Sequence, residues 1–483
     1  MNRQIVKLFG LIVVLFGVLI GFTSYWSVFE AEALQEKTAN KRPLLEQQRI
    51  ERGRILAADG TVIARSVAKG RGDNLRYVRR YPEGALFGHP IGYSFVRQGD
   101  SQFEKFHNDE LVGNESEFVS LLDELRGQAQ EGNDVVTSLD PEGQRVALSG
   151  LEAAGRGAVV AIEPSTGRVR AMVSNPPYDP NRVPFELEEL NENVAESPLF
   201  DRATQGQYPP GSTFKVVTAA AGLGSGTIDL ESTIEAPATI DVQGQPLANS
   251  DGASYGAIPL EAALTGSVNT WFAQLGEDIG SDTLFEYMDR FGFGSTPAID
   301  LPDDEVSRSG VFEGDELLGR GDPVDVARVA IGQERLAVTA LQMAQVAAAV
   351  ANDGTLMKPQ IWSRVVDPDG RVTERLDPST YSEPMDEETA AALTDAMEGV
   401  VNEGTGTNAA ISGVPVAGKT GTAETPGNES CGETDANQAW FIGFAPADDP
   451  EIAIAVTVEC TPSFGGEIAA PIFREVAEAL LDE

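Results

Sequence analysis

Residues 208–218 read YPPGSTFKVVT, and this stretch places a serine hydroxyl and a lysine amine one helical turn apart. Two prolines and a glycine end any preceding helix, whereas apolar residues at helical spacing follow from Thr213. We therefore expect a helix to begin at or beside Ser212. Residues i and i+3 share a helix face, so the amine of Lys215 can reach back toward the Ser212 oxygen. Such a pair can perform nucleophilic chemistry without histidine if the lysine is neutral.

Alone, this spacing is a weak signal, because an N-cap serine followed by an exposed lysine gives the same pattern. Two later stretches strengthen it. Residues 267–269 read Ser-Val-Asn within a segment that has apolar residues at helical spacing, and residues 419–421 read Lys-Thr-Gly at the start of a strand-rich region. Each could be structural, with Ser267 and Asn269 bonding local backbone and Lys419 exposed on a strand. Ser-x-x-Lys, Ser-x-Asn and Lys-Thr-Gly in this order are nevertheless a specific combination.

Length and composition favour a multidomain enzyme outside the cytoplasm. The chain has 483 residues, of which 41% are hydrophobic, enough for two or three domains with substantial cores. Its net charge of −40 argues against binding to nucleic acids or anionic lipids. A solvated acidic surface explains this charge, and adaptation to salt is a weaker hypothesis. His89 and His107 are the only histidines, so we expect neither a serine-histidine triad nor a metal site, and no cofactor.

The N-terminal region predicts one membrane-spanning helix. Residues 8–26 are almost wholly apolar, close to the ~20 residues that a spanning helix needs. Arg3 and Lys7 precede this run and three glutamates follow it, so the positive-inside rule places the N-terminus in the cytoplasm. A cleaved signal peptide is the alternative, because Ala-Glu-Ala at 31–33 resembles a cleavage site. The length of the run favours an uncleaved anchor.

The rest of the chain predicts an α+β protein with an antiparallel sheet flanked by helices. Two hairpins are expected, at 54–65 around an Asp-Gly turn and at 158–173. We also expect a helix at 115–125, a loop at 98–110 and an acidic loop at 181–198 on the rim of a cleft. The expected domains are 1–27 (cytoplasmic tail and transmembrane helix), 28–150 (juxtamembrane segment and pedestal) and 151–483 (catalytic domain). Asn402, Gly404 and Thr405 could form another cleft loop or a plain turn.

The only two cysteines predict a disulfide. Residues 419–424, 439–445 and 452–459 look like three consecutive antiparallel strands. Cys431 falls between the first two strands and Cys460 ends the third, so both lie at the same end of the sheet. An extracytoplasmic compartment permits oxidation, and we expect a bond near the active-site rim. Two free thiols are the alternative.

About two thirds of the chain resembles a known family. Residues 157–474 look like the transpeptidase domain of class B penicillin-binding proteins, including Tyr-Pro-Pro-Gly at 208–211 and Trp-Phe-Ile-Gly-Phe-Ala-Pro at 440–446. Residues 52–64 are similar to the juxtamembrane motif of that family. Residues 67–150 match more loosely the short pedestal of the PbpA-type subgroup. The resemblance implies the penicillin-binding transpeptidase fold, which is shared with serine β-lactamases, and a D,D-transpeptidase that cross-links peptidoglycan.

The resemblance also implies catalytic roles. Ser212 would attack the penultimate D-Ala carbonyl of a stem peptide and form an acyl-enzyme, with Lys215 as the base. Ser267 would relay a proton to the leaving amine, and Asn269 would bond Lys215 and the substrate amide. Lys419 would attract the substrate carboxylate and help keep Lys215 neutral.

Three further residues follow Lys419 in the same motif. Thr420 and Thr422 would contact the substrate through their hydroxyls. Gly421 would let substrate approach the strand without a side-chain clash. The oxyanion hole would consist of the backbone N–H groups of Ser212 and Thr422.

Partners and alternatives complete the expectation. The family binds β-lactam antibiotics and usually works beside a polytopic glycan polymerase in the membrane, so the resemblance implies both. One alternative is a β-lactam hydrolase or sensor of the same fold, in which water replaces the acceptor amine. The other is a non-catalytic cell-wall scaffold with an idle serine. A scaffold should tolerate Ser212→Ala in a growth complementation test.

Overall fold

The computed structural model describes residues 2–28, 48–113, 131–424, 431 and 436–481. Its central sheet has five antiparallel strands in the order β20-β21-β22-β7-β8. From edge to edge they are β20 (Ala417–Glu424), β21 (Asn437–Ala445), β22 (Ile452–Thr461), β7 (Gly157–Ile162) and β8 (Val169–Asn175). The predicted meander and the predicted hairpin at 158–173 are confirmed, and they form one sheet because β22 pairs with β7.

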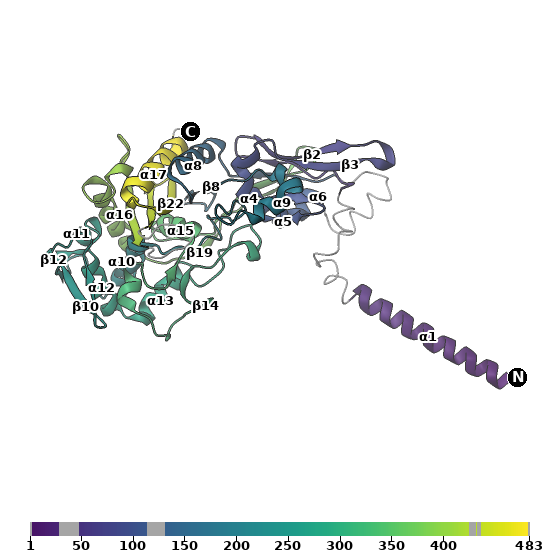
Figure 1. Cartoon of the computed structure of the whole chain (residues 1–483), viewed down its shortest axis with the longest axis horizontal. Coiled ribbons are helices and arrows are strands. Elements are labelled where there is room, and N and C mark those ends of the chain that lie inside the picture. Colours follow the sequence, from purple (N-terminus) through teal and green to yellow (C-terminus); the bar gives the residue numbers. More distant parts are fainter. Residues whose placement is uncertain (1, 29–47, 114–130, 425–430, 432–435, 482–483) are drawn as a thin grey trace.

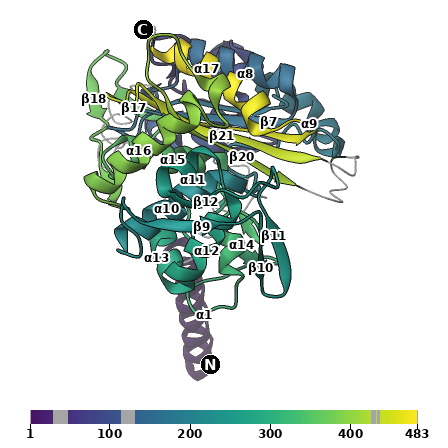
Figure 2. The same cartoon turned by 90° about the vertical axis from the view of Figure 1, so that its left-hand side faces the viewer.

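One face of this sheet is covered by α8 (Pro141–Ala154) and α17 (Gly465–Leu481), as Figure 2 shows. Successive side chains of a strand point to opposite faces, so neighbouring residues of β21 enter different cores. Phe441 packs with the two helices, and its ring centroid lies 4.8 Å from that of Phe473 in α17. Ile442 belongs to the core on the other face.

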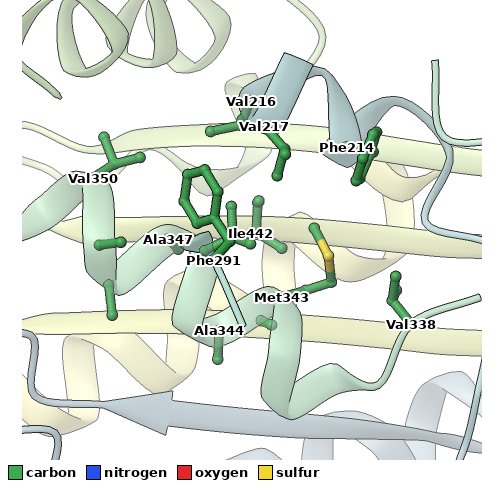
Figure 3. Packing of buried hydrophobic residues seen from close by; sticks show 14 of the residues in the cluster. Phe214, Val216, Val217, Phe291, Val338, Met343, Ala344, Ala347, Val350 and Ile442 are labelled. Carbon is green, nitrogen blue, oxygen red and sulfur yellow. The ribbon is translucent and has the colours of Figure 1, made fainter. Parts of the chain in front are cut away.

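The opposite face is covered by α10 (Lys215–Gly224) and α15 (Ala340–Ala351). Figure 3 shows Val217 of α10 and Ala347 of α15 close to Ile442 of the sheet. Both helices are rich in alanine and valine, and these small side chains let the helices lie close to the sheet. The start of α10 is thereby held beside β20, which contacts the turn at Gly211–Phe214.

The remaining elements of this layer are helices and short strand pairs. The helices are α11 (Leu260–Thr265), α12 (Asn269–Ile279), α13 (Ser281–Arg290), α14 (Val326–Ala330) and α16 (Glu387–Asn402). The strands are β9 (Thr233–Ala236) with β12 (Gly256–Pro259), β10 (Thr239–Val242) with β11 (Gln245–Ala248), β13 (Gly310–Glu313) between β14 (Glu316–Leu317) and β15 (Leu336–Ala337), and β16 (Leu356–Met357) with β19 (Thr380–Ser382).

The pedestal is built on a second sheet, of six strands in the order β18-β17-β6-β1-β2-β3. The strands are β18 (Val372–Arg375), β17 (Trp362–Val366), β6 (Asp134–Thr137), β1 (Ile55–Leu56), β2 (Val62–Lys69) and β3 (Arg76–Arg80). The hairpin predicted around the Asp-Gly turn is confirmed as β1 and β2. Because β17 and β18 come from residues 362–375, the pedestal is not formed by the N-terminal residues alone.

A buried carboxylate lies at the centre of the pedestal. Glu104 receives the guanidinium groups of Arg52 at 2.8 Å and Arg79 at 2.6 Å, and the hydroxyl of Tyr81 at 3.1 Å. Burial alone would raise the pKa of Glu104, but the two arginines lower it. The Arg-Gly of the juxtamembrane motif is therefore structural, since Arg52 holds β1 to the helices around Glu104.

Two expected loops are wrong. Residues 98–110 contain α5 (Gln102–Phe106) and most of α6 (Asn108–Val112), and residues 181–198 contain α9 (Val183–Glu192). The first stretch looks too polar for a core. Its charged Glu104 is nevertheless buried, because arginines far away in the sequence pair with it. In Figure 1, α9 lies beside the pedestal helices rather than at the catalytic cleft. The helix expected at 115–125 lies outside the described residues.

The domain boundary expected at residue 150 falls within α8, whose N-cap is Asp140 and which packs on α17. At the other end, the N-terminal helix α1 (Asn2–Val28) has a candidate membrane span at Arg3–Trp26 with a mean hydropathy of 2.7. None of that span is buried against other parts of the protein. Its length and composition suit a bilayer crossing.

Candidate active site

The turn that carries Ser212 is held by backbone contacts on two sides. The short 3-10 helix at Gly211–Phe214 leads directly into α10. Gly211 has a φ of +53° and its N–H donates to the Gly332 carbonyl at 2.9 Å. A Cβ on Gly211 would lie 2.7 Å from the Thr422 carbonyl oxygen of β20, so only glycine fits here. The predicted helix start is confirmed, with Ser212 in its first turn.

Lys215 is fully buried at the start of α10. Its amine donates to the Ser267 carbonyl at 2.7 Å and to Oδ1 of Asn269 at 2.7 Å, and lies 3.3 Å from the Ser267 hydroxyl. Burial and the nearby amine of Lys419 hold the pKa of Lys215 well below its ordinary value. Both effects disfavour the charged form, so a neutral amine with a free lone pair is accessible near neutral pH.

Ser267 lies in a turn between α11 and α12 rather than inside a helix. Its φ of +53° is uncommon for a residue with a side chain, and its hydroxyl lies between two amines. Lys419 donates to this oxygen at 2.9 Å, and Lys215 approaches it at 3.3 Å. Asn269 is the first residue of α12, and its Nδ2 donates to the Ala248 carbonyl at 3.0 Å, which fixes the amide orientation.

Lys419 is also fully buried, in β20. Besides Ser267, its amine donates to the Thr420 carbonyl at 3.1 Å. Burial lowers the pKa of Lys419 to about 7. This group therefore changes its charge close to neutral pH, and an anion bound beside it would favour the protonated form.

Gly421 is required for packing, which the sequence did not predict. A Cβ at this position would lie 2.6 Å from the Pro210 carbonyl oxygen and 2.9 Å from the Cγ2 of Thr213. The space that a side chain would fill is thus occupied by the turn before α10. This packing role, which brings β20 against the turn that carries Ser212, adds to the predicted substrate-clearance role, which stays a prediction.

The two threonines of β20 face neighbouring loops. The hydroxyls of Thr420 and Thr405 lie 2.5 Å apart, and Thr422 accepts the Gly465 N–H at 3.2 Å. The Thr420 contact shows that the stretch containing Gly404 and Thr405 is a cleft loop, one of the two possibilities that the sequence left open.

An open cleft of about 1250 Å³ lies over these groups. The predicted residues that line it are Ser212, Ser267, Asn269, Thr420 and Thr422. The two lysines lie beneath its floor, within reach through Ser267.

Sequence reasoning missed several residues of the cleft wall, among them Arg328, Gln333 and Phe464. Arg328 and Gln333 reach the site because Gly332 packs on Gly211. A Cβ on Gly332 would lie 1.8 Å from the Gly211 carbonyl oxygen. No local pattern signals such a long-range contact. The one available signal in the sequence was Phe464 before Gly-Gly, and its ring is exposed in the structure.

Both histidines lie elsewhere. His107 contacts Asp300 at 3.2 Å between the pedestal and the catalytic domain, and His89 contacts the Pro176 carbonyl at 3.1 Å. Among the described residues no cluster of histidine, cysteine and carboxylate side chains could hold a metal ion.

Cys431 and Cys460 form a disulfide, with their Cα atoms 5.1 Å apart. The bond connects the segment between β20 and β21 to the end of β22. Glu424 and Asn437, which flank that segment, line the cleft. An Arg156 guanidinium donates to the Cys460 sulfur at 2.9 Å.

Comparisons with known proteins agree with this geometry. Residues 157–478 match the family described as penicillin binding protein transpeptidase domain, and residues 52–135 match penicillin binding protein A dimerisation domain. Peptidoglycan D,D-transpeptidase PbpA of Mycolicibacterium smegmatis is 35% identical over 510 residues, covering 100% of both chains. The same enzyme of Mycobacterium tuberculosis is 34% identical over 505 residues, covering 100% of this chain and 99% of the relative.

Solved structures give the same result. Penicillin-binding protein A from M. tuberculosis, as a ceftriaxone acyl-enzyme complex, superposes with a TM-score of 0.80 at 33% identity, covering 90% of this chain and 100% of that chain. A D,D-transpeptidase domain from Eggerthella lenta has a TM-score of 0.77 at 33% identity, covering 90% of this chain and 99% of that chain.

Proposed function

Because this chain belongs to the penicillin-binding protein transpeptidases and is a peptidoglycan D,D-transpeptidase, we propose that Ser212 is its acylated residue. The observation that carries this assignment is the Ser267 hydroxyl, which lies within 3.3 Å of two fully buried lysine amines under the same cleft. A serine nucleophile needs a neutral base and a path for its proton. In this arrangement Lys215 supplies the base and the Ser267 hydroxyl supplies the path.

In the first half-reaction, Ser212 attacks the penultimate D-Ala carbonyl of a stem peptide. Its hydroxyl proton passes to neutral Lys215, and a bond forms between the serine oxygen and the carbonyl carbon. The hydrogen bonds from the Lys215 amine to Ser267 and Asn269 occupy its protons, so the lone pair remains available for the serine.

Collapse of the tetrahedral intermediate breaks the peptide bond to the last D-Ala. The proton on Lys215 returns through the Ser267 hydroxyl to the leaving nitrogen, which departs as an amine. In the second half-reaction the acceptor amine enters, loses its proton along the same path and displaces Ser212, which recovers its hydrogen. Asn269 bonds the donor amide and keeps Lys215 in position.

The substrate-binding roles fall to β20. Lys419, charged when an anion is bound beside it, attracts the terminal carboxylate of the stem peptide, and Thr420 and Thr422 bond it through their hydroxyls. The backbone N–H groups of Ser212 and Thr422 form the oxyanion hole, in which one donor contributes about 3 to 4 kcal/mol in comparable enzymes. The close packing at Gly421 and Gly211 supports this assignment, because it brings β20 against the turn that carries Ser212.

The membrane arrangement is a further part of the proposal. Helix α1 anchors the chain with its N-terminus in the cytoplasm, and the pedestal and the catalytic domain of residues 151–483 lie outside. Arg3 and Lys7 before the apolar run support this orientation. A polytopic glycan polymerase in the same membrane would supply the strands that are cross-linked, and α1 and the pedestal are the parts nearest to such a partner.

The test uses the full chain in detergent with a synthetic stem pentapeptide and an amine acceptor. We expect one D-Ala released per cross-linked product, and loss of both products in Ser212→Ala and in Lys215→Ala. Release of D-Ala without cross-linking at saturating acceptor would favour a hydrolase. Unchanged turnover in a folded Ser212→Ala variant would overturn the assignment of the nucleophile.

A further inference from the structure

The hairpin formed by β2 and β3 carries an unusual concentration of positive charge. Residues 41–80 contain eleven lysines and arginines and four carboxylates, although the whole chain has a net charge of −40. Residues 81–483 contain 21 lysines and arginines against 68 aspartates and glutamates. A random distribution of charge would make this stretch acidic like the rest, so the basic segment is a distinct feature of the sequence.

The strand register places like charges opposite each other. Arg65 pairs with Arg80 and Lys69 pairs with Arg76, with the pair Val67 and Val78 between them. Directly opposed residues of an antiparallel pair share one face, so these six side chains form a single surface, which we term the basic hairpin face. Arg65 and Lys69 are exposed, and Val67 is 37% exposed.

Within the described part of the chain, Arg65, Lys69 and Arg80 have no carboxylate partner, whereas other basic residues of the pedestal do. Arg79 binds Glu104 on the buried side. The carboxylate of Glu51 interacts with Tyr77, which lies on the opposite face of the hairpin. Like charges placed directly opposite destabilise a strand pair, so this face is best satisfied by an external anion.

The position of the hairpin indicates where that anion is found. The chain leaves α1 at Val28 and re-enters the described structure at Gln48, whose carbonyl accepts the Tyr77 N–H of β3 at 2.8 Å. The nineteen residues between them can span at most roughly 65 Å. Figure 1 shows the hairpin at the end of the molecule opposite the catalytic domain. The hairpin is thus tethered within roughly 65 Å of the end of α1, close enough for it to reach the bilayer.

We propose that the basic hairpin face binds the anionic phospholipid headgroups of the membrane that α1 spans. Its cations attract headgroup phosphates, and Val67 and Val78 between them contact the apolar boundary beneath. The acidic catalytic domain is repelled by the same surface, so the two effects together hold the pedestal on the membrane and the cleft away from it. The net charge of the whole chain, which argued against anionic lipids, conceals this local exception.

The test places the full chain in nanodiscs of phosphatidylcholine, with or without phosphatidylglycerol. A fluorophore is attached at Asn74→Cys in the hairpin loop, which is selective because the two native cysteines are bonded to each other. Lipids with a headgroup quencher report contact. We expect quenching with phosphatidylglycerol only, and its loss when salt is raised from about 50 mM to about 500 mM.

Two charge-matched variants complete the experiment. In the first, the four cations of the basic hairpin face become glutamine, and we expect the contact equilibrium constant to fall by roughly fivefold per cation. In the control, four exposed arginines of α8 and the catalytic domain become glutamine, and quenching should persist; these are Arg145, Arg290, Arg308 and Arg320. Melting temperatures establish that both variants are folded.

Three results would overturn the proposal. Equal quenching in both kinds of nanodisc would show that the lipid charge is irrelevant. An equal loss in both variants would show that only total charge matters. The third result is that neither membrane quenches the fluorophore, whereas a second copy of the chain or a soluble acidic polymer that carries the quencher does. This result would assign the face to another anionic partner.

Discussion

The pH dependence of acylation follows from the charge of Lys419. The pKa of this buried amine is lowered to about 7, and we propose that its charged form binds the substrate carboxylate. The charged form predominates below the pKa and is lost above it, so binding is favoured on the acid side. The charged fraction is about one half at pH 7 and about 1% at pH 9, so acylation should fall roughly fiftyfold over this range.

The assay measures the second-order rate constant for acylation by a fluorescent penicillin, which reports pKa values of the free enzyme. The penicillin carboxylate stays ionised throughout this range. Its methyl ester is the matched control, because it has no carboxylate to lose contact with Lys419 and should show no decline on the alkaline side.

The variant Lys419→Met provides a second control. Acylation of this variant should be slow at every pH and should not decline on the alkaline side. Removing this amine also removes one cause of the lowered pKa of Lys215, so the remaining activity should rise at higher pH than in the wild type. A wild-type rate that stays constant from pH 7 to pH 9 would refute the role of Lys419 as a titrating carboxylate anchor.

Three further outcomes are expected. Burial alone would lower the pKa of His107, but its bond to Asp300 raises it to about 9. The protonated imidazole should therefore stabilise the folded state by about 3 kcal/mol below pH 6.5, and this stabilisation should disappear as the pH rises through 9. Urea titrations should show this slope in the wild type and not in His107→Gln, and equal slopes would contradict it. Gly421→Ala should lower stability by about 1 to 3 kcal/mol and slow acylation; weaker substrate binding at unchanged melting temperature would instead support a substrate-clearance role. Replacing Cys431 and Cys460 by serine should cost about 3 kcal/mol, and a melting temperature of the wild type that does not respond to reductant would argue against the bond.

The candidate site was accessible from sequence because its chemistry depends on residue types at short spacings. Ser212 and Lys215 fall within one turn, and the triplets at 267–269 and 419–421 are equally local. Strand-like runs at 419–424, 439–445 and 452–459 predicted the meander, and the meander in turn predicted the pairing of the two cysteines.

The parts that were missed depend on contacts between distant residues. Glu104 made residues 98–110 look like a loop, because the arginines that neutralise it lie 52 and 25 positions away. The packing of Gly421 against Pro210 was missed for the same reason, since the two residues are far apart in the sequence. Only the folded chain shows which apparently polar or empty positions are occupied.

The most direct test of the account is to incubate the full chain with fluorescent penicillin and to map the adduct by intact mass and tryptic peptides. We predict one stable adduct on the peptide containing Ser212, absent from Ser212→Ala. An adduct on another residue, or none from a folded chain, would contradict the assignment of Ser212 as the acylated nucleophile.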